Sequence, residues 1–150
     1  MRQLAILAVL VAFAALPVRA ADTAAAPIIV MPTQLAWTTS DQLPAGSKMA
    51  VLQGDPSKPG YYTIRFSLPD GAAFPVHLHG TDEYVTVLEG TLLVGLGDTV
   101  DKAKMTALPA GSFVAVPAGL HHWSIAKGDT IEQVAGEGPI NNIPIKPGKM

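Results

Sequence analysis

The residues best suited to chemistry lie in one stretch bounded by glycines, residues 71–90, which reads GAAFPVHLHGTDEYVTVLEG. His77 and His79 are two residues apart, and Glu83 follows four residues later. Residues i and i+2 of a β-strand project from the same face, so a strand here presents both imidazoles side by side. Residues 80–82, Gly-Thr-Asp, allow a sharp reversal, after which Glu83 begins an antiparallel neighbour. The stretch therefore predicts three metal-ligating side chains that face one interior.

A second stretch, residues 111–122, reads GSFVAVPAGLHH and contains the other two histidines of the chain. His122 follows a Pro-x-Gly turn and stands at the start of a further strand. Alternation along that strand points His121 away from the site that His122 faces, so we expect His122 to be the ligand. A register shifted by one residue beside the turn is the alternative. His121 is otherwise an exposed or pocket-rim residue.

Three imidazoles and one carboxylate form a ligand set that suits a borderline divalent metal such as Mn, Fe, Ni, Cu or Zn. The chain has no cysteine, so a transition-metal site must use histidine and carboxylate ligands. Four protein ligands leave up to two positions open on an octahedral ion, where substrate or dioxygen can bind. A dication with one carboxylate ligand has a net charge of about +1, which suits an anionic ligand. The alternative is a degenerate site that holds no metal.

Short strands joined by turns are the expected structure, since the 150 residues include 13 prolines and 14 glycines. This length suggests one domain. The clearest strand is 61–68, in which Tyr62, Ile64, Phe66 and Leu68 share one face. We expect a tight hairpin at Glu89-Gly90, a turn at 127–129, an irregular stretch over 97–111 with a helical turn near 101–105, and a possible strand at 34–38. The other expected strands are 48–53, 74–79, 82–89, 91–96, 112–116, 121–126 and 130–135, a pattern that favours a small all-β barrel or sandwich.

The two histidine stretches resemble the paired motifs of the cupin superfamily. Residues 71–90 fit the first motif, G-x5-H-x-H-x3,4-E-x6-G, at every defined position. Residues 111–122 fit the second, G-x5-P-x-G-x2-H-x3-N, as far as the histidine, and Ala126 stands where the pattern has Asn. The resemblance implies a single-domain (monocupin) double-stranded β-helix, or jelly-roll barrel. It also implies that His77, His79, Glu83 and His122 are the metal ligands.

The ligand set and the resemblance together favour a metal-dependent oxygenase that acts on a small enolic, phenolic or carboxylate molecule. A different class of function also fits, namely a non-catalytic periplasmic module that binds or senses a metal or a small ligand. A sugar isomerase or epimerase is a third and weaker alternative, because a fold alone does not determine a function.

The N-terminus has the pattern of a cleavable export signal, with a basic Arg2, an apolar run over 4–16 and small residues before a cut between Ala20 and Ala21. An uncleaved N-terminal anchor is the alternative. The expected organisation is a signal peptide over 1–20, an N-terminal extension over 21–33 and the barrel domain over 34–150. The protein is then secreted or periplasmic.

The charge balance argues against a nucleic-acid partner. Cleavage removes Arg2 and Arg19, so the 10 basic side chains become 8 against 12 acidic ones, which leaves no basic footprint. We expect a small-molecule ligand and no stable membrane insertion after cleavage. Tyr84, Leu88, Trp123 and Ile125 alternate out of phase with the ligands, and a monomer would expose some of them, which suggests a homodimer through the outer sheet. Packing in the core is the expected role of Trp123 itself.

Overall fold

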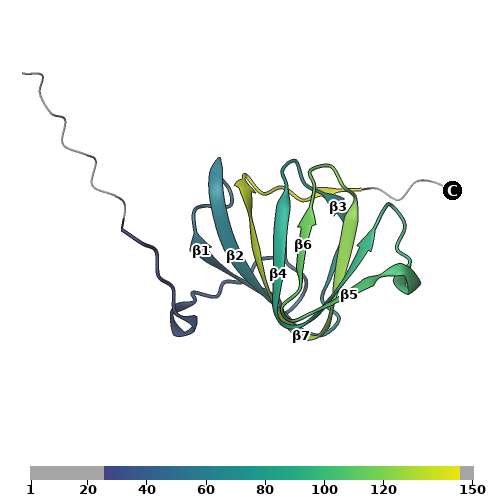
Figure 1. The fold of residues 1–150 in the computed structure, drawn as a ribbon, viewed down its shortest axis with the longest axis horizontal. Helices are drawn as coiled ribbons and strands as arrows, with labels where there is room; N and C mark the ends of the chain where they lie inside the picture. Colours follow the sequence, from purple (N-terminus) through teal and green to yellow (C-terminus); the bar gives the residue numbers. More distant parts are fainter. Residues whose placement is uncertain (1–25, 146–150) are drawn as a thin grey trace, which may run out of the picture.

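Antiparallel strands build the fold in the computed structural model, which describes residues 26–145 (Figure 1). They join into one eight-stranded sheet that curves into a barrel, and two short 3₁₀ turns are the helical elements of the described part. The expected all-β architecture is confirmed. The elements are η1 (Pro32–Gln34), β1 (Lys48–Gln53), β2 (Gly60–Leu68), β3 (Ala73–Leu78), β4 (Glu83–Leu96), η2 (Lys102–Lys104), β5 (Thr106–Pro109), β6 (Phe113–Val116), β7 (His122–Gly138) and β8 (Ile143–Pro144). The predicted signal peptide, residues 1–20, lies outside the described residues, and no helix within 26–145 is long and apolar enough to cross a bilayer.

The two longest strands, β4 and β7, pair with each other and hold the barrel together. β7 pairs with β2, β3 and β4, and β4 pairs with β5, β6 and β7. The predicted hairpin at Glu89-Gly90 and the turn at 127–129 are therefore wrong, because each strand continues through its glycine. Gly90 has φ +74° and Gly128 has φ +71°, and the β4–β7 register shifts around Glu89. An irregularity of this kind bends a strand without reversing it.

The two bends lie against each other, which explains why glycine is required at one of them. A Cβ at Gly90 would lie 2.3 Å from the carbonyl oxygen of Asp129, whereas one at Gly128 would meet nothing within 4 Å. Only glycine combines a positive φ with so close an approach of two backbones. The long strands therefore turn together from one half of the barrel into the other.

The barrel interior is filled by alternate residues of β2, β4 and β7. Tyr62, Ile64, Phe66 and Leu68 of β2 are buried as predicted. Trp123 is only 2% exposed, which agrees with the expected packing of its ring in the core. Its ring packs on Gly95, where a Cβ would lie 2.2 Å from the indole. The absence of a side chain at Gly95 is what creates space for the ring.

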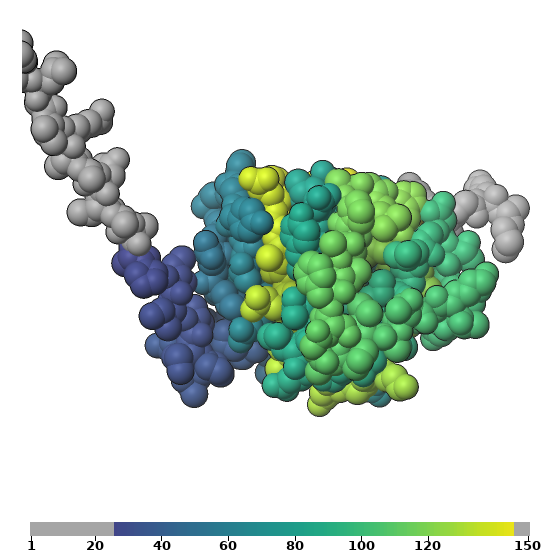
Figure 2. All heavy atoms as spheres, viewed as in Figure 1, coloured from purple at the N-terminus to yellow at the C-terminus, as the bar shows by residue number. Residues whose placement is uncertain are grey.

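The segments outside the main strands differ in part from expectation. η1 and an isolated Thr38–Met49 bridge replace the possible strand at 34–38. η2 confirms the helical turn near 101–105, but β5 was not predicted in the stretch thought irregular. β5 pairs with residues 91–94 of β4. The N-terminal segment from residue 26 lies at one flank of the barrel, beside β1 and β2 (Figure 2).

Candidate metal centre

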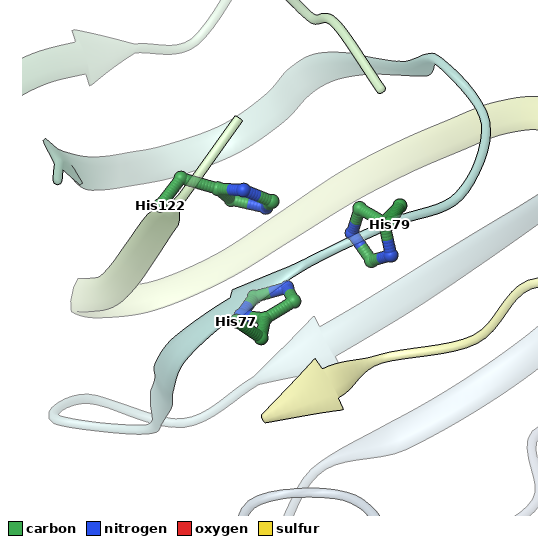
Figure 3. A group of neighbouring side chains, drawn as sticks. All are labelled: His77, His79 and His122. Atoms are coloured by element: carbon green, nitrogen blue, oxygen red, sulfur yellow. The ribbon is translucent and has the colours of Figure 1, made fainter. Parts of the chain in front are cut away.

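Three histidines meet inside the barrel because two strands bring the motifs into register. His77 on β3 is the ladder partner of His122, the first residue of β7, and His79 follows β3 by one residue. Their ligand nitrogens all lie within 4.8 Å of one another, and the three side chains are buried (Figure 3). The ring centroids are 4.2 to 5.1 Å apart. The geometry is that of a site that could hold a metal ion.

Each imidazole is oriented by a hydrogen bond from its Nδ1 to a backbone carbonyl. His77 donates to Pro75 over 2.7 Å, His79 to Asn141 over 3.1 Å, and His122 to Leu120 over 2.9 Å. A carbonyl oxygen can only accept, so each Nδ1 must carry the proton, and the neutral ring then has a free lone pair on Nε2. Such contacts fix the tautomer of metal-ligating histidines. Three Nε2 lone pairs are therefore prepared as ligands.

Glu83, the first residue of β4, faces this cluster with both carboxylate oxygens. Oε1 lies 3.4 Å from His79 Nε2, and Oε2 lies 3.5 Å from His122 Nε2. Burial favours the neutral form of the carboxyl, but the contacts with His122 and His79 outweigh burial and lower the pKa of Glu83 to about 2. The carboxylate is satisfied by these Nε2 atoms when they carry protons, and a cation can take the place of those protons when the imidazoles are neutral. The donor set therefore fits a metal ion.

The histidines respond differently to this environment. Burial lowers the pKa of His77, and the neighbouring imidazoles lower it further. Burial also acts to lower the pKa of His79, but the contact with Glu83 outweighs it, and the net direction is upward. Since a metal ligand must be neutral, His77 is the more readily available of the two as the pH falls.

The loops of the two histidine stretches are tied together by backbone hydrogen bonds. Gly119 N–H donates to the carbonyl of His79 over 2.9 Å, and Ala118 N–H donates to Asp82 Oδ1 over 2.8 Å. Ala126, which replaces the Asn of the family pattern, lies in β7 and exchanges backbone hydrogen bonds with Gly71 and Ala72. Local strand geometry is thus retained without that Asn.

His121 lies outside the cluster. Its Nδ1 contacts the Asp98 carboxylate, and its side chain is 31% exposed. The structure brings His122 together with His77 and His79, and Glu83 lies beside them.

A small cavity of about 50 Å³ adjoins the histidines and Glu83. A larger cleft of about 550 Å³ shares four of its lining residues, namely Phe66, Phe74, Ile140 and Asn142. The first volume suits one or two waters or a group the size of a carboxylate. The second lies in the range of small-molecule sites. Val85 and Ser124 also line the small cavity.

Glu132 also lines the small cavity, and sequence reasoning missed it. It is 4% exposed, and it lies on β7 between buried Thr130 and Val134. The sequence carries a signal for it, since Thr130, Glu132 and Val134 alternate along the strand and therefore share one face. An apolar residue such as Val134 on that face indicates that the face points inward. Burial, and secondarily the charge of Glu83, raises the pKa of Glu132 to about 8.

Comparison with known proteins agrees with the fold. Residues 64–134 match the family model "Cupin domain", which includes both histidine stretches. Auxin-binding protein ABP19b of Prunus persica is 31% identical over 72 residues, which are 47% of this chain and 34% of that protein. Germin-like protein subfamily 3 member 3 of Arabidopsis thaliana is 30% identical over 70 residues, 46% of this chain and 33% of that protein. The chain thus matches about a third of the length of these relatives.

Solved structures resemble a larger part of the chain. A candidate acetylacetone dioxygenase from Methylibium petroleiphilum has a TM-score of 0.67 and 17% identity, and the alignment covers 86% of this chain and 89% of that one. The polyketide cyclase RemF from Streptomyces resistomycificus has a TM-score of 0.63 and 17% identity, with coverage of 81% and 85%. The predicted double-stranded β-helix of the cupin type is confirmed.

Proposed function

We propose that this cupin-fold barrel is a metal-dependent oxygenase that acts on a small enolic, phenolic or carboxylate molecule. The observation that carries the proposal is the convergence of three buried histidines, whose ligand nitrogens lie within 4.8 Å of one another, beside a Glu83 carboxylate that contacts His79 and His122. A buried group of this composition is well suited to a divalent ion and poorly suited to stand without a cation.

His77, His79, His122 and Glu83 would hold the ion in this proposal. A bound redox-active ion supplies Lewis acidity and electron transfer to dioxygen. The chain contributes fixed ligand orientation through the three Nδ1–carbonyl hydrogen bonds. The single negative charge of Glu83 would leave the loaded centre positive, which favours an anionic substrate.

The larger cleft gives the substrate a place beside this centre. Phe66 and Phe74 contribute aromatic surface to both cavities. Gln42, Asn141 and Asn142 add amide groups to the cleft. An apolar wall with a few polar groups is typical of small-molecule sites. The fold is shared with the candidate acetylacetone dioxygenase (17% identity) and with an oxalate oxidase (20% identity, TM-score 0.53), and this likeness in fold is consistent with the proposal.

Two measurements test the proposal. Elemental analysis of protein purified from its own export compartment should find about one iron, manganese, nickel or copper ion per chain. An oxygen electrode should then detect uptake with at least one of acetylacetone, catechol or oxalate, and none after chelation. Tightly held zinc with no turnover of any compound would instead identify a binding module. Conversion of a sugar without oxygen uptake would identify an isomerase or epimerase.

We also propose that the protein is exported and loses residues 1–20. Mass spectrometry of the mature protein should place its N-terminus at Ala21. A chain that keeps Met1 in the membrane fraction would contradict this.

A homodimer through the outer sheet is a further part of the proposal. Tyr84 and Phe113 stack there with ring centroids 6.4 Å apart, and Phe113 and Leu88 are 61% and 38% exposed. Apolar surface of this kind is suited to a partner copy. A monomer in sedimentation at micromolar concentration would refute this part and leave the metal centre unaffected.

A further inference from the structure

The second carboxyl of the barrel, Glu132, has no role in the ligand set described above. Its ladder partners are Phe66 on β2 and Val87 on β4. Val87 is four residues from Glu83, so the two acids are separated by about 13 Å along β4 at the level of the backbone. Both side chains nevertheless line the same small cavity.

Glu132 lacks the partners that a buried acid normally has. Among the groups of residues 26–145, none forms a hydrogen bond with its Oε2. Arg65 precedes Phe66, the ladder partner of Glu132, but its side chain donates a hydrogen bond to Gln133 instead. Phe66, Val85, Val87 and Leu92 are buried apolar residues of the same interior. An ionised carboxylate among such residues is costly, so Glu132 is a neutral acid.

A neutral carboxylic acid differs from Glu83, the other acid of the cavity, because it can donate a hydrogen bond. We propose that Glu132 donates a hydrogen bond to an oxygen of the ligand bound in the histidine-lined cavity, and that this ligand is a small carboxylate or enolate. This inference rests on the proposed function for the presence of a metal ion, but not for turnover.

The cavity supports this ligand class by its size and its polar groups. About 50 Å³ admits a group as small as a carboxylate. A metal held at the histidines and Glu83 would attract one negative oxygen, and Glu132 would satisfy another. An apolar ligand would leave the Glu132 hydroxyl unpaired, which disfavours its binding.

Formate binding to the zinc-loaded protein tests the inference, because zinc excludes redox turnover. Two variants are compared with the wild type by calorimetry. Glu132→Leu removes the donor, and Glu132→Gln replaces it with an amide donor of similar shape. Glu89→Gln, at an exposed acid on β4, is the matched control. Zinc content is measured for every sample.

The expected result is a rise of about 10- to 100-fold in the Kd for formate in Glu132→Leu, since the lost hydrogen bond is to a charged acceptor. Glu132→Gln should stay within about threefold of the wild type, as should Glu89→Gln, and all should bind one zinc. The inference is overturned if Glu132→Leu binds formate with wild-type affinity, or if Glu132→Gln loses as much formate affinity as Glu132→Leu. Loss of zinc in Glu132→Leu, or a wild type that binds no formate, would also overturn it. Oxygen uptake is measured separately, with the iron- or manganese-loaded wild type. A wild type that takes up no oxygen would refute the proposed oxygenase without changing the result for formate binding.

Discussion

The pH dependence of unfolding should reveal Glu132 directly, through the variant Glu132→Gln. The pKa of the carboxyl is raised from an ordinary value of 4.5 to about 8 in the folded protein, by burial and then by Glu83. Between these values the folded state holds one more proton than the unfolded state, so the free energy of unfolding falls as pH rises. The slope is about 1.4 kcal/mol per pH unit, and the total over the window is about 5 kcal/mol. Above pH 8 this contribution is fully lost.

Urea unfolding at half-unit steps from pH 5 to pH 9 measures this contribution as the difference between wild type and Glu132→Gln. The variant cannot titrate at this position, so the free energy of unfolding of the wild type should fall relative to that of the variant by several kcal/mol as the pH rises. The other shifted groups of the cavity, His77, His79 and Glu83, are present in both proteins and cancel to first order. Measurements in chelator and in saturating zinc keep metal linkage separate. A difference that is constant with pH would refute the neutral state of Glu132.

Three further predictions concern the metal centre and the strand bends. His122→Ala should lower metal affinity by at least 10- to 100-fold, whereas His121→Ala should leave it unchanged; equilibrium dialysis decides, and the reverse result would place the register wrong by one. Chelation should lower the Tm, since an ion at 1,000 times its Kd stabilises the fold by about 4 kcal/mol, and an unchanged Tm in calorimetry would contradict a folded-state site. Gly90→Ala should lower the free energy of unfolding by about 2–4 kcal/mol more than Gly128→Ala does, because only a Cβ at position 90 meets the Asp129 carbonyl. Equal urea midpoints for the two variants would contradict the close packing of the two bends.

Sequence reasoning could bring the candidate metal ligands together because their positions depend on local rules. Alternation puts His77 and His79 on one face, and the Pro-x-Gly turn sets the start of the strand at His122. The tautomers could not be predicted, since the carbonyls of Pro75, Asn141 and Leu120 become acceptors only once the chain has folded.

Two features of the fold that turn composition and strand alternation do not explain have a common cause, which is that glycine has several structural uses. Glu89-Gly90 has the composition of a hairpin turn, yet the backbone approach of Asp129 makes Gly90 a bend within β4. Trp123 alternates with the outward face, yet Gly95 on the paired strand makes space for its ring. Both facts depend on a partner strand distant in sequence. The residue pattern of one strand cannot predict where its partner strand has a glycine in place of a side chain.

The two cavity acids have opposite protonation states because their neighbours differ. Glu83 contacts two imidazoles and is ionised, whereas Glu132 lies among valine, leucine and phenylalanine side chains and is neutral. Environments that separate the pKa values of two acids commonly assign them different roles. An ionised Glu83 suits a cation, and a neutral Glu132 suits an oxygen acceptor without adding negative charge. Ionisation of Glu132 beside the ionised Glu83 would place a second anion in the cavity and weaken binding of a negatively charged ligand, so the β4–β7 pairing that separates the acids also determines which ligands the cavity can accept.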